Sequence, residues 1–267
     1  MLIDLHVHTR RYSACGHADP EEMAAAAEAY GLDAMVITEH HVRWSEDELV
    51  DLQGAFPRVR LFAGVEITTE RSGDLLVIGA SGRDWFRPRM PAEDVVAEAH
   101  ARGGVVIAAH PFRPGYPGYG LDRLDLDAIE VHSKHMHYGA HEAAVDLAQR
   151  RGLRMVATSD AHTTDMVGLY ALRLEAPASS EEELADMIRA GAYSMEADPS
   201  RLEALNRERQ SLWHEAAAMI RAGADDDEVV ARVPGVSYTE ARHLRAGQRV
   251  GWPEVAAFEP AGPFRRG

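Results

Sequence analysis

Strand-like and helix-like segments alternate over residues 1–190 of this chain, and this alternation restricts the fold more than any other feature. The strand-like segments are short and rich in Val, Ile, Leu and Ala. They span 1–9, 34–37, 59–65, 75–79, 105–109, 128–132, 154–158 and 170–175. Helices are expected between them over 20–30, 45–53, 91–102, 137–151 and 180–190. Such alternation with short connections predicts an α/β fold, a mainly parallel sheet with helices outside it.

Histidines and acidic residues occur where these strands end. In the first strand, Asp4, His6 and His8 occupy alternate positions and therefore share one face. The later strand ends carry His40, Glu66, His110, His132, Asp160 and His162. In a barrel of parallel strands the carboxyl ends meet at one mouth, so these side chains are expected to converge there.

This set of side chains is typical of a metal site, because neutral imidazole is the commonest ligand and a carboxylate can orient it from behind. Asp4 is expected to play that orienting role. The set exceeds the needs of one tetrahedral zinc ion, which favours two or three ions that share a bridging carboxylate. Glu66 is the expected bridge, and Asp160 is expected to complete the first metal site or to take a proton from the attacking water. Few soft ligands are present, which favours Zn, Mn or Fe over copper.

Five motifs resemble those of the PHP (polymerase and histidinol phosphatase) family, and they occur in the family's order between residue 2 and about residue 190. The motifs are Asp4-x-His6-x-His8-Thr9, Thr38-Glu39-His40, Gly64-Val65-Glu66, Ala109-His110-Pro111 and Ser159-Asp160-Ala161-His162. The resemblance implies a distorted seven-stranded (β/α)7 TIM-like barrel. It also implies a trinuclear metal site that hydrolyses phosphoesters.

The resemblance further implies a ligand set for each ion. The first metal would be held by His6, His8, Glu66 and Asp160. The second would be held by Glu66, His110 and His132, and the third by His40 and His162.

Three positions depart from the family's pattern. Glu39 replaces the usual aspartate of the second motif and is expected to stand behind the ligands. The remaining ligand of the third metal is usually Asp or His, and here Cys15 or His17 would have to serve. His132 stands where many relatives carry a tyrosine.

Two cations are candidates for contacts with substrate. Arg113 follows His110 closely and could hold a phosphate by two hydrogen bonds, and Lys134 could act as a point charge. The interval between Glu66 and His110 leaves no room for a large inserted substrate domain, which favours a small or open-ended substrate.

Several histidines are not expected to be ligands. His41 follows His40 directly, and neighbours in an extended segment face opposite ways. His135, His137 and His141 border a helix and are expected to be exposed, although His135 could reach the mouth of the barrel.

The sequence changes character after residue 198, which predicts a barrel domain over 1–198 and a C-terminal helical extension over 199–267. Helices are expected over 200–222, 225–233 and 237–246, and the last two have helix-turn-helix spacing. Arg242, Arg245 and Arg249 give the last helix a basic side that could meet DNA. The four acids of 225–228 would repel phosphates, so packing, oligomerisation or a substrate lid is the preferred role.

Composition narrows the class of protein. The 267 residues are 46% hydrophobic, which is ordinary for a soluble globular protein. The formal net charge of −15 disfavours nucleic-acid or anionic-membrane binding by the whole surface. The chain has one cysteine, so an intrachain disulfide is excluded. Neither a signal peptide nor an apolar run of about 20 residues is visible, and a cytoplasmic location is expected.

Together these features predict a metal-dependent phosphoesterase with two or three divalent ions (Zn, Mn or Fe). The preferred activity is that of a phosphomonoesterase, which would use a metal-bridging hydroxide on a small phosphorylated metabolite or nucleotide. One alternative is a TatD-like or other metal-dependent nuclease, although the pair Asp160 and His162 disfavours TatD. Another is a DNA-binding regulator. A homo-oligomer through the C-terminal helices is a further expectation.

Overall fold

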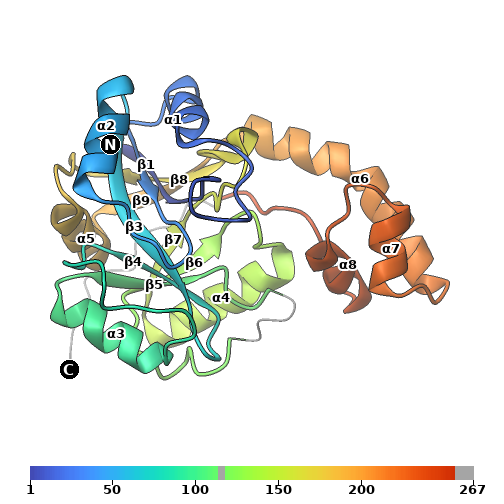
Figure 1. The fold of residues 1–267 in the computed structure, drawn as a ribbon. Helices are drawn as coiled ribbons and strands as arrows, with labels where there is room; N and C mark the ends of the chain where they lie inside the picture. Colours follow the sequence, from blue (N-terminus) through green and yellow to red (C-terminus); the bar gives the residue numbers. More distant parts are fainter. Residues whose placement is uncertain (114–117, 256–267) are drawn as a thin grey trace.

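The structure is a computed structural model that describes residues 1–113 and 118–255. Within these residues nine strands form one mixed sheet, which curls into a nearly closed barrel with helices outside it (Figure 1). The expected barrel with a C-terminal helical extension is therefore confirmed in kind, although the strand count differs from seven. The expected extension continues to residue 267, and its last part, 256–267, lies outside the described residues.

The strands follow one another around the barrel in the order β7-β6-β5-β4-β3-β2-β1-β8-β9. Their bounds are β1 (Leu2–Val7), β2 (Ala34–Ile37), β3 (Arg60–Thr68), β4 (Asp74–Ile78), β5 (Val105–Ala109), β6 (Ala128–His132), β7 (Arg154–Ala157), β8 (Tyr170–Leu174) and β9 (Tyr193–Ala197). Strands β1 to β3 pair in parallel, as do β5 to β7. β4 and β8 run antiparallel to both of their neighbours.

The ninth strand, β9, has no counterpart among the predicted strands. Its residues Tyr-Ser-Met-Glu-Ala are partly or fully exposed, so the segment lacks the apolar run that identified the other strands. β9 joins the sheet only through its neighbour β8, with which it forms an antiparallel pair. A local sequence pattern does not show this tertiary pairing.

Helices lie where the sequence predicts them. Their bounds are α1 (Pro20–Ala29), α2 (Glu46–Ala55), α3 (Ala92–Ala101), α4 (Tyr138–Arg151), α5 (Glu181–Ala190), α6 (Pro199–Arg221), α7 (Asp226–Arg232) and α8 (Tyr238–Arg245), with a 3₁₀ turn at Thr164–Met166. The end signals are visible in the structure. The Ser45 side chain caps α2 by accepting a hydrogen bond from the backbone N–H of Glu48, and Gly152 ends α4 in the left-handed conformation.

Most of the strands are buried on both faces, because helices cover the outside of the barrel while side chains fill its interior. Every residue of β2, β4 and β5 is buried. In β1, the apolar residues Ile3, Leu5 and Val7 are fully buried, and so are the alternating polar residues Asp4 and His6. The polar face of β1 therefore points into the protein, where a buried polar group needs a partner.

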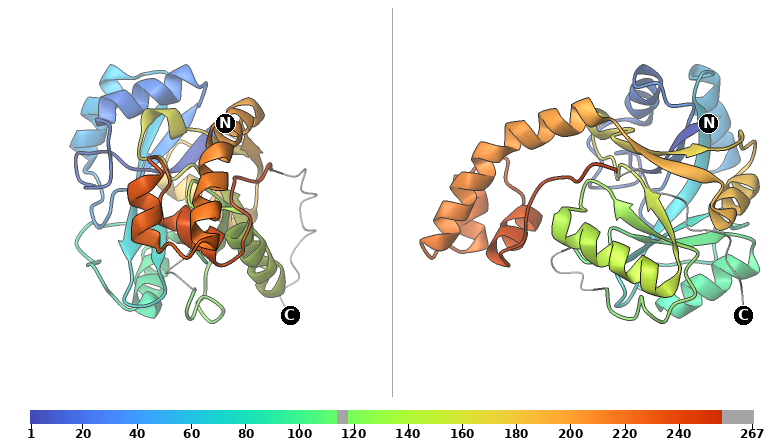
Figure 2. Two further views of the ribbon diagram at one scale, coloured as in Figure 1. Left: turned by 90° about the vertical axis from the view of Figure 1, so that its right-hand side faces the viewer. Right: turned by 180° about the vertical axis from the view of Figure 1, so that it is seen from behind.

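The C-terminal helices project from the barrel as an arm (Figure 2). The chain then returns to the barrel after α8, where the Trp252 indole donates a hydrogen bond to the carbonyl of Lys134 at 2.8 Å. Tyr170 of β8 likewise donates to the carbonyl of Pro253 at 2.7 Å. These bonds tie the end of the arm to the loop that follows β6 and to β8.

Two of the arginines expected on the basic side of α8 pair within the arm. Arg245 donates to Asp226 of α7 at 2.8 Å, and Arg242 lies 3.6 Å from the same carboxylate. The acids of α7 thus compensate part of this positive charge, while DNA binding stays an untested alternative. In the described part of the chain, no helix combines the length and apolar character that a membrane crossing requires.

Candidate metal centre

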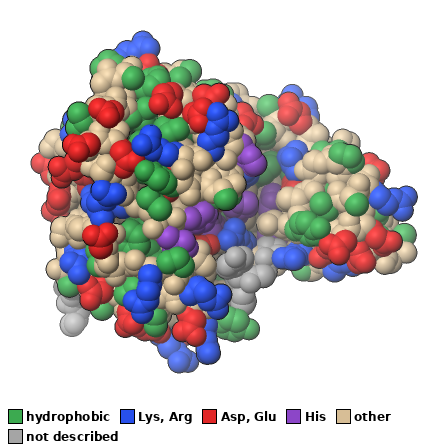
Figure 3. Space-filling view, in the orientation of Figure 1, with side chains coloured by type: hydrophobic (Ala, Val, Ile, Leu, Met, Phe, Trp, Pro, Cys, Tyr) green, Lys and Arg blue, Asp and Glu red, His purple; other side chains and the backbone are tan. Residues whose placement is uncertain are grey.

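The imidazoles and carboxylates predicted from the strand ends largely converge at the carboxyl ends of the parallel strands. They form several groups of three in which one potential ligand atom per residue lies within 4.8 Å of the other two. These groups are His6–Glu66–His110, His6–His8–Asp160, His8–His40–Glu66, His8–Cys15–His162 and His135–Asp160–His162. Histidine side chains gather in the hollow between the barrel and the arm (Figure 3).

Glu66 lies at the centre of the cluster. Its Oε1 is 3.0 Å from His110 Nε2, while its Oε2 is 3.0 Å from His40 Nδ1 and 3.1 Å from His8 Nε2. The Nε2 atoms of His6 and His8 are 2.9 Å apart, so both rings point to the same spot. This position of Glu66 suits the bridging role expected of it.

Asp160 faces the cluster from the loop after β7. Its Oδ1 lies 3.3 Å from the Nε2 atoms of both His6 and His162. Its Oδ2 lies 3.4 Å from His135 Nε2 and 3.7 Å from His110 Nε2. Asp160 therefore touches the imidazoles of four different segments.

Several polar atoms of the cluster are not satisfied by the protein. In the described ranges, Glu66 Oε2, both carboxylate oxygens of Asp160, and the Nδ1 atoms of His40 and His162 are buried without a hydrogen-bond partner. Their close contacts with ring nitrogens lack hydrogen-bond geometry. An unsatisfied buried polar group costs about 1–3 kcal/mol, and nearly all such groups in proteins have partners. Ligation of divalent cations would satisfy these atoms, so the residues present fit a metal centre.

The charges of the cluster shift its pKa values in opposite directions. Burial alone would lower the pKa of His6, but the charges of Asp160, Glu130 and Glu66 raise it well above its ordinary value. Burial alone would raise the pKa of Glu66, yet His6 and the neighbouring imidazoles lower it well below its ordinary value. The pKa of His162 rises to about 9, because Asp160 outweighs the opposing effect of burial. The carboxylates are thus held in the ionised form that metal binding requires.

Two residues of the cluster have strained backbones. His110 directly follows β5 and has φ 27°, and Asp160 in the loop after β7 has φ 50°. The left-handed region is uncommon for residues other than glycine and costs of order 1–3 kcal/mol. Such strain is typical of functional sites, where the surrounding structure fixes the direction of a side chain.

Glu130 of β6 supports the cluster from beneath. It is fully buried, and its Oε1 accepts hydrogen bonds from His6 Nδ1 at 2.8 Å and from the Thr158 hydroxyl at 2.6 Å. Its Oε2 accepts a hydrogen bond from the His110 backbone N–H at 2.6 Å. Because a carboxylate can only accept, the proton of the neutral His6 ring is held on Nδ1, and Nε2 is free to bind a metal.

Asp4 does not orient an imidazole, so the expectation based on the strand alternation is wrong. Its carboxylate instead accepts hydrogen bonds from the backbone N–H groups of His6, Ser159 and Gly168. Asp4 therefore holds the loop that carries Asp160 against β1. Sequence reasoning missed Glu130, although one signal was present. It is the single acid of β6, with apolar residues on either side of it and His132 two positions later.

Glu39 stands behind the ligands, as expected. It is fully buried and accepts hydrogen bonds from the backbone N–H and the hydroxyl of Thr9, which directly follows His8. The Trp44 indole also donates to it, at 3.4 Å. The longer side chain of glutamate thus serves to anchor the turn after β1.

The structure places His135, and not His132, beside Asp160. His132 belongs to none of the potential ligand groups in the described residues, and its ring packs against those of Tyr170 and His141 at 5.1 and 4.5 Å. Burial lowers the pKa of His132 to about 3. The register of β6 against β7 shifts between residues 130 and 132, so simple alternation fails at the end of β6. The assignment of His132 to the second metal is corrected accordingly.

The other histidines near α4 also differ from expectation. His137, expected to be exposed, is buried beneath the arm against Trp213 and Trp252. Its Nδ1 accepts a hydrogen bond from the Gly251 backbone N–H at 3.1 Å. His141 is partly buried and donates to the carbonyl of Val131 at 2.8 Å. The docking of the arm, which local sequence does not show, accounts for the burial of His137.

The structure separates the two candidates for the last ligand of the third metal. Cys15 is half-buried and shares a potential ligand group with His8 and His162. Burial opposes ionisation of its thiol, but the neighbouring imidazoles of His162 and His40 lower the pKa of Cys15 to about 6. His17 is exposed and belongs to none of the groups found in the described residues.

Two cations lie beside the cluster. Arg113 is 17% exposed and donates to Asp74 at 2.8 Å. Burial lowers the pKa of His135 well below its ordinary value, and the charges of Arg113 and Lys134 act in the same direction. Lys134 directly precedes His135 in the chain and Arg113 follows His110 by three positions, so both cations belong to the loops that carry these imidazoles.

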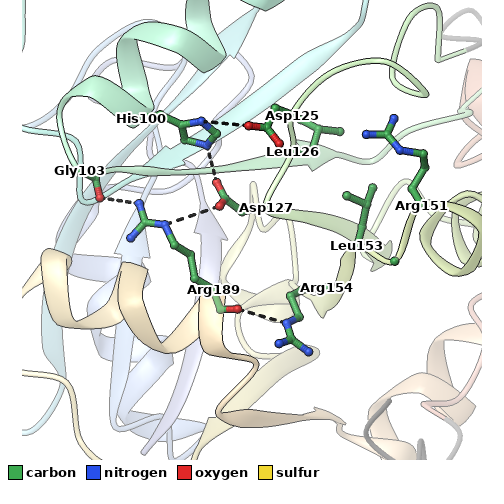
Figure 4. Close-up of a pocket in the computed structure, with 10 residues that line it drawn as sticks. His100, Gly103, Asp125, Leu126, Asp127, Arg151, Leu153, Arg154 and Arg189 are labelled. Carbon is green, nitrogen blue, oxygen red and sulfur yellow. Dashed lines mark hydrogen bonds and ion pairs between the residues drawn. The ribbon is translucent and has the colours of Figure 1, made fainter. Parts of the chain in front are cut away.

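Figure 4 shows a different pocket, at the amino ends of β5, β6 and β7. Its charged side chains pair with one another or with the backbone. His100 lies 2.9 Å from Asp127, and Arg189 donates to the carbonyls of Gly103 and Gly104. Contacts at this end of a barrel usually serve stability, whereas sites for chemistry lie at the carboxyl ends.

Known proteins are similar to this chain in both sequence and fold. Two family models match, the PHP domain over residues 4–111 and the PHP-associated region over 139–193. An uncharacterized protein of Methanocaldococcus jannaschii is 29% identical over 144 residues, which cover 49% of this chain and 81% of that protein.

Two solved structures share the fold. PsfC from Pseudomonas syringae PB-5123 has a TM-score of 0.55 at 23% identity, covering 79% of this chain and 98% of PsfC. A two-domain protein from Bacteroides vulgatus ATCC 8482, described as containing a predicted PHP-like metal-dependent phosphoesterase, has a TM-score of 0.56 at 19% identity. That match covers 73% of this chain and 64% of the other. Sequence, fold and motif order agree, and the chain belongs to the PHP family.

Proposed function

We propose that this chain is a metal-dependent phosphoesterase, and in the first place a phosphomonoesterase that acts on a small phosphorylated metabolite or nucleotide. Its membership of the PHP family supports a metal-dependent hydrolase. The observation that carries the proposal is the convergence of imidazoles on Glu66 and Asp160. Within the described residues, Glu66 Oε2 and both carboxylate oxygens of Asp160 are buried and left unsatisfied.

The ligand sets are those that the family resemblance implies, adjusted to the groups of neighbouring side chains. His6, His8, Glu66 and Asp160 would hold one ion. Glu66 and His110 would contribute to a second, together with His135 in place of His132, since the ring centroids of His110 and His135 are 5.6 Å apart. His40 and His162, each of which shares a group with His8, would contribute to a third. When bound, divalent ions supply Lewis-acid chemistry that activates water and stabilises the charge of a phosphoryl displacement.

The protein's own groups bind and orient the substrate. Arg113 and Lys134 place positive charge near the cluster, although the protein as a whole has a net charge of −15. A phosphate is the ligand that such a pair of cations attracts. The ion pair with Asp74 fixes the Arg113 guanidinium. Burial keeps His135 neutral at pH 7, because its pKa lies well below the ordinary value, and neutral imidazole is the form that binds a metal.

The substrate would lie in the hollow between barrel and arm, where the arm would limit its extent on one side (Figure 3). The loop after β6 forms part of this boundary, because Lys134 is tied to the end of the arm through its carbonyl. A compact phosphoester fits this arrangement better than a long duplex. A short single strand with a terminal phosphate is the second substrate class to examine.

The test is a comparison of metal-loaded and metal-free protein on a panel of phosphoesters. The panel contains nucleoside monophosphates, sugar phosphates and short oligonucleotides, each with Mn²⁺ or Zn²⁺ supplied. We expect phosphate release from at least one monoester, and a loss of more than about 100-fold in His8→Ala. His214→Ala is the matched control, because His214 is exposed on the arm. Absence of turnover from protein shown to contain its ions would overturn the proposal.

A further inference from the structure

The single cysteine of the chain, Cys15, lies among the imidazoles of the cluster. One potential ligand atom from each of His8, Cys15 and His162 lies within 4.8 Å of the other two. Most other donors of the centre are nitrogen or oxygen atoms, so a sulfur at this position changes which ions it prefers. Soft thiolate favours zinc, whereas oxygen donors suit manganese and magnesium.

A second observation points to a ligand at this position. The side chain of His162 is 9% exposed, and in the described residues its Nδ1 has no hydrogen-bond partner. Its Nε2 faces Asp160 at 3.3 Å. A buried imidazole nitrogen that lacks a partner, next to a thiol, is the arrangement that a shared cation would complete.

The loop that carries Cys15 is built against these histidines. The Ser13 hydroxyl lies 3.2 Å from His8 Nδ1 and accepts a hydrogen bond from the His40 backbone N–H at 3.1 Å. Two residues after Cys15, the His17 backbone N–H donates to the carbonyl of His162 at 2.8 Å. The loop is therefore fastened to the ring of His8 and to the backbones of His40 and His162, the three histidines that surround the thiol.

Gly16 makes this close approach possible. A Cβ atom at residue 16 would overlap with the Thr9 carbonyl group, because the two backbone segments are in direct contact. The turn is closed by a hydrogen bond from the Gly16 N–H to the carbonyl of Ser13 at 2.9 Å. As a result Cys15 is directed inward, while His17, two residues later, is exposed.

We propose that Cys15 binds a divalent ion as a thiolate, together with His162 and the imidazoles beside it, and that this position selects Zn²⁺ over Mn²⁺ and Mg²⁺. The inference rests on the proposed function, since it assumes that the centre holds metal. The inference adds that the metal position at Cys15 differs chemically from the other metal positions. The positions around Glu66 and Asp160 accept either Zn²⁺ or Mn²⁺, whereas the position at Cys15 requires a thiophilic ion.

The first test is replacement of the native ions by Co²⁺, followed by absorption spectroscopy. A cobalt–thiolate bond gives a charge-transfer band in the near ultraviolet, while nitrogen and oxygen ligands give only visible bands. We expect the near-ultraviolet band in the unaltered protein and in His17→Ala, and its complete loss in Cys15→Ser. Cys15→Asp is expected to lose the band and to retain the ion, which shows that the fold is intact.

The second test uses the reactivity of the thiol. Because the chain has one cysteine, a thiol reagent reports on Cys15 alone. We expect Zn²⁺ to suppress the reaction of the folded protein with the reagent and Mn²⁺ to leave the rate unchanged. If Zn²⁺ and Mn²⁺ suppressed the reaction of Cys15 equally, the proposed selectivity for Zn²⁺ would be overturned.

The outcomes separate this inference from the proposed function. Visible cobalt bands and phosphoester hydrolysis without the near-ultraviolet band would overturn the thiolate ligand and leave the phosphoesterase standing. The near-ultraviolet band in a protein that hydrolyses no phosphoester would support the thiolate site and overturn the proposed activity.

Discussion

Replacement of Glu130 by glutamine tests whether Glu130 keeps the Nε2 atom of His6 free of a proton and so able to bind a metal. The Glu130 carboxylate accepts three hydrogen bonds, from His6 Nδ1, the Thr158 hydroxyl and the His110 backbone N–H. An amide of the same shape offers one oxygen and one NH₂ group, so at least one of these donors must face another donor. Both carboxylate positions therefore matter, and the substitution cannot be neutral.

The size of the effect follows from which donor loses its partner. With the NH₂ group toward His110, one charge-assisted bond of about 1.5–3 kcal/mol is lost. With the NH₂ group toward His6, the ring must carry its proton on Nε2, which removes the lone pair that would bind a metal. Loss of such a supporting group typically weakens metal binding about 10- to 100-fold.

The assay is metal affinity by competition with a chelator, together with the thermal midpoint of unfolding for metal-free protein. We expect Glu130→Gln to weaken Zn²⁺ binding at least about tenfold and to lower the midpoint. Glu142→Gln is the matched control, because Glu142 is exposed on α4. Affinity equal to that of the unaltered protein would refute the argument that Glu130 sets the protonation of His6.

Three further predictions follow from particular contacts. His135→Ala is expected to reduce metal content and activity, whereas His132→Ala leaves metal content unchanged; metal analysis of both variants decides between them. The metal-free protein is expected to lose stability as pH rises from about 6.5 to about 9. The reason is that the raised pKa of His162 stabilises the fold only while the ring is protonated, and this pH dependence of the unfolding midpoint should flatten in His162→Gln. Trp252→Ala removes a buried indole and is expected to cost about 3–5 kcal/mol, which protease cutting of the arm would reveal, with metal content retained.

The sequence predicts the centre well where local geometry is regular. Alternation in β1 places His6 and His8 on one face, and parallel strands bring Glu66, His110 and Asp160 to one mouth. These inferences need only the period of a strand and the direction of the sheet.

The errors arise where tertiary structure overrides the local pattern. The register shift in β6 turns His132 out of the cluster, and the docked arm buries His137. The partner of Glu130 comes from a strand 124 positions earlier, so no local motif reveals it. The choice between Cys15 and His17 depends on a tight turn around a glycine, which spacing alone does not fix.

The central claim is that scattered imidazoles and acids meet to bind metal ions at one mouth of the barrel. Anomalous X-ray scattering at the zinc absorption edge, from crystals grown with Zn²⁺, tests it most directly. We predict anomalous peaks in the cluster, with at least one ion about 2.0–2.2 Å from Glu66 and Asp160 oxygens. Zinc bound only at other surfaces, with no peak beside these two carboxylates, would contradict the account.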